Sequence, residues 1–315
     1  MRVLLAGATG VLGRELLPLL RKAGHHVTAL VRGPAQDLDA DAVVTGDLLD
    51  GPGLVAAVAA ARPEVVVHQV TALRPVSGDT RWEVFERTAH VRRVGTANLV
   101  DAARAAGARR IVAQSIAFAT APCGDPVLAE DAPLYVEAPD ATWALTVQAV
   151  AALERTVLDA ADLAPIVLRY GSLYGQYTLY DASGAIGQAV HLGRLPLVGD
   201  GAGLTSFVTV RDAALATVLA VGHPATGVFN IVDDAPAPAH SWLPGYADLL
   251  GAPEPKRIPV DLGERLLGWY GAYQQTRQRG ASNAKARREL GWRPTVPTWE
   301  DGICQAHAEA VRSQA

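Results

Sequence analysis

The stretch VLLAGATGVLGREL, residues 3–16, places three glycines directly after an apolar run and at the start of a helix-like segment. The first glycine of such a turn permits a tight bend, the second lets a pyrophosphate approach the backbone, and the third lets helix and strand pack closely. Free N–H groups at the helix start also favour phosphate. In this context the spacing predicts a dinucleotide site, with a purely structural turn as the alternative. The loop comprises Gly7, Ala8, Thr9, Gly10, Val11, Leu12 and Gly13.

Short valine-rich runs alternate with helix-like segments through the first 170 residues. This alternation predicts an α/β fold, a doubly wound parallel sheet with helices on both faces. The expected strands are 2–6, 26–31, 42–45, 64–69, 109–115 and 164–170, and the expected helices are 11–23, 51–61, 80–106 and 141–161.

The pattern changes after Tyr170, where glycine and proline become frequent. We therefore expect a dinucleotide-binding domain over residues 1–171, rejoined by about 206–232. The remaining segments, 172–205 and 233–315, are expected to form a smaller, discontinuous substrate-binding lobe.

Composition excludes several classes of function. The chain has 315 residues, a net charge of −4 and no basic block, which argues against a nucleic-acid partner. Cys123 and Cys304 are far apart and form no CxxC pattern, so we expect no disulfide and a reducing cytoplasm. No apolar run approaches the roughly 20 residues of a membrane helix. The start of the chain lacks the features of a signal peptide. The eight histidines are scattered, so we expect no metal site.

Arg32 ends the second strand-like run, in the segment TALVRGP. An acidic residue here would bind the adenosine ribose 2′-hydroxyl and favour NAD(H), whereas a guanidinium suits a 2′-phosphate. We therefore expect NADP(H) to be preferred, with NAD(H) also compatible; a solvated surface arginine is the alternative. Asp47 and Leu48 follow the third strand, where Asp47 is expected to hydrogen-bond the adenine or to cap the next helix.

Motifs along almost the whole chain resemble the extended short-chain dehydrogenase/reductase family, the NAD-dependent epimerase/dehydratase group. The resemblance rests on the order and spacing of ten segments, and it implies a Rossmann-type domain with a small C-terminal substrate lobe. The segments are GATGVLG (7–13), GDL (46–48), VVVH (65–68), GTANLVDAA (95–103), VAQSIAFA (112–119), EDAPL (130–134), VLRYGSLYG (167–175), SFVTVRDAA (206–214), FNIVDD (229–234) and SNAKARRELGW (282–292).

The resemblance also implies roles for individual residues. Ser115 matches the active-site serine that hydrogen-bonds the substrate oxygen. Arg169, Tyr170 and Gly171 begin the segment expected to pass near the nicotinamide. His68 ends the fourth strand near the cofactor, where a hydrogen bond in the core or to the ribose is favoured over general-base catalysis.

The family's catalytic YxxxK pair is missing from this chain. Its only lysines are Lys22, Lys256 and Lys285, and none has a tyrosine four residues before it. When Glu154 is aligned with a glutamate common in the family, Thr146 and Val150 take the two catalytic positions. Arg92 also replaces an asparagine often seen before the family's GT.

Another group must therefore supply any proton. Ser115 and Thr146 can orient a substrate, but neither is a competent acid near neutral pH without an activating base. Tyr174 and Tyr177 are the favoured catalytic candidates, on a loop expected over the nicotinamide; turn formation and packing are the alternative roles.

The leading hypothesis is an NADP(H)-binding enzyme with an altered site that acts on a small organic molecule. A redox-neutral isomerase, cyclase or lyase that uses the dinucleotide as a scaffold is the second hypothesis, and a non-enzymatic NADP(H) sensor is the third. The apolar helix 141–161 and its neighbour 80–106 are expected to form a homodimer interface.

Overall fold

The computed structural model describes residues 1–34, 38–73 and 81–305. The chain forms two compact units. The first comprises Met1–Ile116, Val136–Arg169 and Ala214–Phe229, and the second comprises Ala117–Tyr135, Tyr170–Ala213 and the chain from Asn230 onward. Residues 117–135, which the sequence placed in the dinucleotide domain, thus belong to the second unit.

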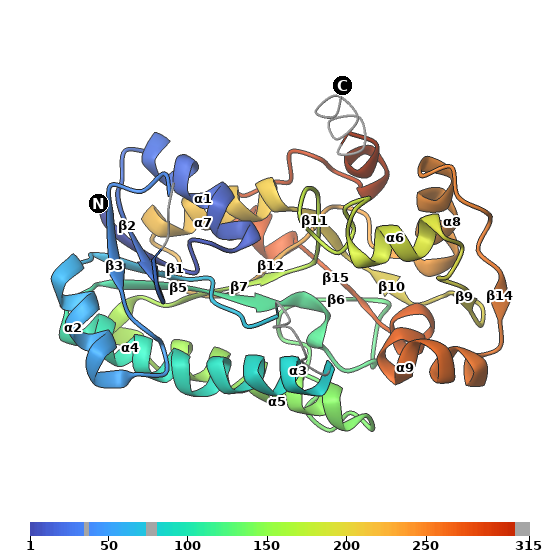
Figure 1. Cartoon of the computed structure of the whole chain (residues 1–315), viewed down its shortest axis with the longest axis horizontal. Coiled ribbons are helices and arrows are strands. Elements are labelled where there is room, and N and C mark those ends of the chain that lie inside the picture. The colour runs from blue at the N-terminus through green and yellow to red at the C-terminus, as the bar shows by residue number, and fades with distance from the viewer. Residues whose placement is uncertain (35–37, 74–80, 306–315) are drawn as a thin grey trace. The chain divides into compact units, whose positions relative to one another are not determined.

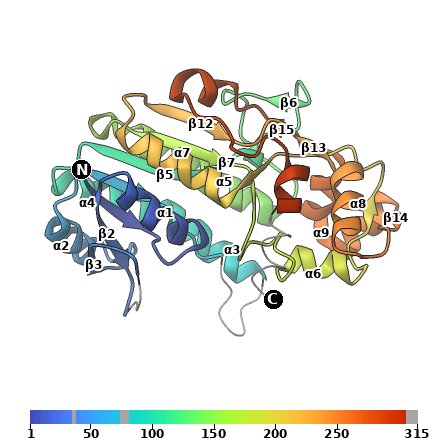
Figure 2. The ribbon, with the colours of Figure 1, turned by 90° about the horizontal axis from the view of Figure 1, so that it is seen from above.

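A seven-stranded parallel sheet forms the centre of the first unit, and it confirms the expected doubly wound, Rossmann-type α/β fold. Its order is β12-β7-β5-β4-β1-β2-β3, which Figure 2 shows fanned out from β3 to β12. The strands are β1 (Arg2–Ala6), β2 (His26–Val31), β3 (Ala42–Thr45), β4 (Val65–His68), β5 (Arg110–Ile116), β7 (Ile166–Tyr170) and β12 (Gly227–Ile231). After β1 the chain adds β2 and β3 on one side of β1 and then crosses to β4 on its other side. The switch point, where the strand order reverses, therefore lies between β1 and β4.

Helices cover both faces of this sheet, as expected from its fully buried, valine-rich central strands. On one face lie α1 (Val11–Lys22) and α7 (Val210–Gly222), and the other face carries the remaining helices (Figure 1). These are α2 (Gly51–Ala61), α3 (Arg81–His90), α4 (Thr96–Ala105) and α5 (Ala141–Leu158). Leucine, valine and alanine side chains of the sheet pack against those of α2, α4 and α5 in one core on this second face.

The segment expected as one helix, 80–106, is interrupted by a π-helical turn in its described part. This turn, η1 (Val91–Gly95), joins α3 to α4. A π turn inside a helix is rare and occurs frequently at functional sites. Arg92 in this turn and Thr96 directly after it are buried, whereas Arg93 and Val94 are exposed.

The second unit combines short strand pairs with helices, among them α6 (Ala185–His191), α8 (Ala239–Leu249) and α9 (Val260–Thr276). Its core is aromatic and includes Tyr174, Tyr180, Phe207, Trp242 and Trp299. The paired strands are β8 (Ser172–Tyr174) with β11 (Phe207–Thr209), β9 (Leu197–Val198) with β14 (Arg257–Ile258), β10 (Leu204–Thr205) with β13 (Ala237–Pro238), and β6 (Val127–Leu128) with β15 (Gly280–Ala281).

Candidate active site

The glycine loop after β1 has the geometry of an anion site. Gly7 has a φ of +94°, and a Cβ there would lie 2.6 Å from the carbonyl oxygen of Gln69. A Cβ on Gly13 would lie 2.1 Å from the carbonyl oxygen of Gly7, so the helix contacts the loop directly. The first turn of α1 contains no acidic side chain. Its N–H groups are therefore available to a phosphate.

The adenosine end of the expected cofactor site follows β2 and β3. Arg32 is exposed directly after β2, and it makes no hydrogen bond or ion pair with the rest of the described chain. Asp47 is also exposed, and its Oδ1 accepts a hydrogen bond from the Leu49 N–H at 2.9 Å. The cap of α2 is instead Asp50, whose Oδ1 accepts from the Gly53 N–H at 3.2 Å. Leu48 is buried below this turn.

His68 is neutral and fully hydrogen-bonded at the end of β4. Its Nδ1 accepts a hydrogen bond from the Val70 N–H at 3.3 Å, so Nε2 carries the proton and donates it to Thr96 Oγ1 at 2.9 Å. Burial, and then the charge of Arg92, lowers the pKa of His68 to about 4. Both ring nitrogens are thus occupied, which favours the structural role over general-base catalysis.

Ser115, Glu154 and Arg169 form a buried network that joins β5, α5 and β7. Ser115 Oγ donates a hydrogen bond to Glu154 Oε1 at 2.6 Å. Arg169 donates from Nε to Oε1 at 2.8 Å and from Nη2 to Oε2 at 2.7 Å. The hydroxyl hydrogen of Ser115 is therefore engaged in a hydrogen bond to a carboxylate. The Arg169 side chain is buried away from solvent. Ser115 as placed has no hydrogen left to donate to a substrate oxygen.

The exposed start of α5 leads into a buried, non-ionisable surface. Asp140 caps the helix by accepting from the Trp143 N–H at 2.7 Å. Thr146 donates its hydroxyl proton to the carbonyl oxygen of Thr142 at 2.9 Å, within the same helix. Val150 is buried one turn before Glu154. From Ala141 to Leu153 the helix therefore offers no titratable side chain.

The two tyrosine candidates have different environments in the second unit. Tyr174 is a strand residue of β8 rather than a loop residue, it is 1% exposed, and its ring meets Phe207 edge-on at 6.1 Å between centroids. Burial, followed by the nearby Asp233, raises the pKa of its phenol. Tyr177 is 64% exposed. These positions favour packing for Tyr174 and leave Tyr177 accessible to solvent.

Tyr170 and Gly171 lie at the start of the second unit, directly after Arg169. Tyr170 is buried. The Gly171 N–H donates to the carbonyl oxygen of Ile231 at 3.1 Å, and a Cβ at Gly171 would lie 2.5 Å from the carbonyl oxygen of Ser206. Close backbone packing therefore requires glycine at this position.

Arg92 is a candidate functional residue that the sequence identified only as a departure from the family pattern. It is 7% exposed, and burial lowers the pKa of its guanidinium to about 10. It makes no hydrogen bond or ion pair with any residue that the structure describes. The signal in the sequence was its position four residues before Thr96, on the side of the helix that becomes buried.

The described residues contain no candidate for a metal centre or for a membrane-spanning helix. No group of three or more His, Cys, Asp or Glu side chains there could hold a metal ion. No helix in this part of the chain is long and apolar enough to span a membrane.

Comparison with known proteins gives the family. The model of the "NAD dependent epimerase/dehydratase family" matches residues 3–232. The chain belongs to this family. It is an NAD(P)-dependent enzyme that acts on a small molecule.

Similar proteins include both reductases and epimerases. A 3-diazoavenalumate denitrifying reductase from a Streptomyces species is 57% identical over 96% of this chain and 99% of its own. A UDP-glucose 4-epimerase from Mycolicibacterium smegmatis is 30% identical over 94% of each chain. The solved UDP-glucose 4-epimerase of Thermotoga maritima, with UDP-glucose, has a TM-score of 0.77 and 19% identity over the full length of both chains. The last likeness shows the fold alone.

Replacing Glu154 with Leu should lower the free energy of unfolding by about 3–5 kcal/mol, because the buried Arg169 guanidinium loses its counter-ion. The double variant Glu154→Leu/Arg169→Leu should be less destabilised than Glu154→Leu alone. Urea denaturation measures the free energy of unfolding of the single and the double variant. Asp261→Asn, which breaks the exposed pair with Arg265, is the control and should cost less than about 1 kcal/mol. A similarly small effect of Glu154→Leu would contradict a structural role for the network.

Proposed function

We propose that this protein is an NADP(H)-dependent reductase that replaces the diazo group of a small carboxylic acid with hydrogen and releases dinitrogen. The observation that carries the proposal is the lack of any ionisable side chain on α5 between Ala141 and Leu153. The 57% identity to a 3-diazoavenalumate denitrifying reductase supplies the substrate class.

The reaction balances without a proton donor when the diazo compound reacts as its diazonium cation. A diazonium cation R–N₂⁺ accepts the hydride of NADPH, the C–N bond breaks, and the products are R–H, N₂ and NADP⁺. The electron pair of the hydride forms the new bond to hydrogen, and the pair of the broken C–N bond leaves with N₂. The cofactor is oxidised by two electrons and the diazonium cation is reduced by two. Carbonyl reduction, in contrast, also requires a proton for the alkoxide oxygen.

The residues of the first unit fit this requirement. Thr146 and Val150 stand where the family resemblance expects a tyrosine and a lysine, and the Thr146 proton is directed to Thr142. Ser115 donates to Glu154, and His68 is neutral with both nitrogens occupied. None of these groups is placed to protonate a substrate. Apolar surroundings also protect a reactive cation from water, which would otherwise attack it.

Turnover of 3-diazoavenalumate should consume one NADPH per N₂ released, because no other reductant enters the balance. Absorbance at 340 nm measures the NADPH consumed, and mass spectrometry of ¹⁵N₂ from a labelled diazo group measures the N₂ released. The solvent deuterium isotope effect on kcat should be close to one. We also expect kcat to be flat between pH 6 and 8, since the lowered pKa of His68, about 4, keeps this residue neutral throughout that range.

Thr146→Val tests the lack of a helix-borne acid. It should retain turnover within about threefold, whereas loss of a general acid typically costs 10²–10⁴-fold. A large solvent isotope effect together with a 10²-fold loss in Thr146→Val would contradict the proposal. Turnover without net oxidation of NADPH would instead support a redox-neutral reaction, and binding of NADPH without turnover would support a sensor.

NADP(H) is the proposed cofactor because Arg32 is exposed after β2 and has no partner among the described residues. The wild type should bind NADPH about tenfold or more tightly than NADH, the value of one charge-assisted contact. Arg32→Ala should remove most of this ratio, and the control Arg194→Ala, an exposed arginine of the second unit, should leave it unchanged. Fluorescence titration of both cofactors measures the ratio. Equal affinities in the wild type would contradict the preference.

We further propose a cytoplasmic homodimer formed through residues 80–106 and 141–161. Trp82 and Val94 are exposed on the first segment, and Leu145 is partly exposed on α5. Burial of such side chains against a second copy is favourable. The two cysteines are unpaired, which suits a reducing compartment.

Leu145→Glu should shift the dimer towards monomer at micromolar concentration, since it places a charge in an apolar contact. Light scattering measures the mass of the particles. Leu266→Glu, at an exposed leucine of α9 in the second unit, is the control and should remain dimeric. A monomeric wild type, or an unchanged mass in Leu145→Glu, would contradict this interface.

A further inference from the structure

Arg92 is a buried cation without a counter-ion in the described chain. Its side chain is 7% exposed and forms neither a hydrogen bond nor an ion pair there. Burial of a charge is unfavourable unless an opposite charge or several acceptors compensate it. Because its pKa is lowered only to about 10, the guanidinium stays charged at neutral pH. No described residue compensates this charge, so the guanidinium is available to a bound anion.

The fold places Arg92 beyond the carboxyl end of β4. Thr96 contacts His68, the last residue of β4, through the hydrogen bond between Oγ1 and Nε2. Arg92 lies about one helical turn before Thr96, and a helix that connects parallel neighbours runs opposite to the strands. Its side chain is thus at the edge of the sheet where ligands of open α/β folds bind.

Helix α5, which follows β5 in the sequence, also begins at the carboxyl edge of the sheet. Glu154 contacts Ser115 near the end of β5, and Val150 lies one turn before Glu154, towards the carboxyl edge. The turn η1 packs against α5. Arg92 therefore lies on the helix next to the apolar surface formed by Thr146 and Val150, at the level where the proposed substrate would react.

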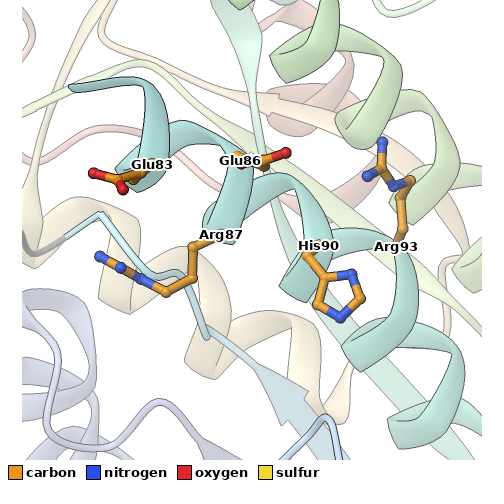
Figure 3. A pocket seen from close by; sticks show the side chains of 5 residues that line it. All are labelled: Glu83, Glu86, Arg87, His90 and Arg93. Carbon is orange, nitrogen blue, oxygen red and sulfur yellow. The ribbon is translucent and has the colours of Figure 1, made fainter. Parts of the chain in front are cut away.

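Five other titratable side chains of α3 and η1 line a separate hollow. Figure 3 shows Glu83, Glu86, Arg87, His90 and Arg93 around an open hollow on α3 and η1. Four of them are exposed and Arg87 is partly buried, so solvent reaches this set. Arg92 is not part of the hollow. The buried guanidinium is thus distinct from the solvated outer side of the helix.

We infer that Arg92 binds the carboxylate of the substrate, an inference that rests on the proposed function for the identity of the acid. A guanidinium matches a carboxylate in charge and in two-pronged geometry. The phosphates of the cofactor have their own candidates, which lie after β1 and β2, namely the start of α1 and Arg32. Arg92 follows β4, on the opposite side of β1 from β2, and is left for an anion of the substrate.

The test measures binding without turnover. NADP⁺-loaded protein is titrated calorimetrically with avenalumate, the named substrate without its diazo group, and with its neutral primary amide. The wild type should bind the acid at least about tenfold more tightly than the amide. Arg92→Met should weaken binding of the acid about 10–100-fold and bring both ligands to similar affinity. Arg92→Lys should keep part of the preference, and Arg93→Met, the exposed neighbour, should keep all of it.

Folding of the variants is checked by thermal denaturation. Arg92→Met should melt at the same temperature as the wild type or higher, because an uncompensated buried charge is removed. If this variant does not fold, Arg92→Gln replaces it in the titration.

The outcomes separate this inference from the proposed function. An unchanged preference for the acid in Arg92→Met, or no avenalumate binding by the wild type, would overturn the role of Arg92. Loss of the preference, in a protein that does not reduce the diazo compound, would support the carboxylate site and reject the denitrifying reaction.

Discussion

The buried pair between Glu154 and Arg169 is the interaction that fixes the arrangement of the candidate site. It joins α5 to β7 through two hydrogen bonds, and the hydroxyl of Ser115 adds a third hydrogen bond that joins α5 to β5. A charged pair removed from water is stable only when its geometry is good and its acceptors are satisfied. Here both carboxylate oxygens are occupied. The register of α5 follows from this anchor, and so does the placement of Thr146 and Val150 towards the carboxyl edge of the sheet.

This arrangement accounts for the apolar surface that α5 presents at the candidate site. The polar groups that it has are directed inward, Glu154 to Arg169 and Thr146 to its own backbone. A reductase with such a surface is suited to a substrate that is already a strong electrophile, because hydride alone completes the reaction. The same surface would be a poor one for an alkoxide, whose charge requires hydrogen-bond donors or a proton.

The order of strands and helices was predictable, because buried parallel strands are almost purely apolar and the glycine loop marks the first crossover. The roles of polar residues were less predictable. Ser115 is a strand serine in sequence, but only tertiary contact shows that its proton goes to Glu154. The segment around Tyr174 contains the glycines and polar residues typical of a loop, yet pairing of β8 with β11 places this ring in an aromatic core. Such contacts join residues distant in the sequence, which local patterns do not encode.

Two buried arginines of the first unit differ in their partners. This difference distinguishes a residue that stabilises the fold from one that we propose to bind a ligand. Arg169 is satisfied by a carboxylate of its own chain, so the contact contributes to the fold and is complete without ligand. Arg92 lies on the neighbouring helix without such a carboxylate, and the charge it adds lowers the pKa of His68 further. A second internal acid would have neutralised Arg92 permanently. No such acid lies in the described surroundings, and in our proposal the carboxylate of the substrate compensates the cation, so that binding of an acidic substrate changes the electrostatics of the site.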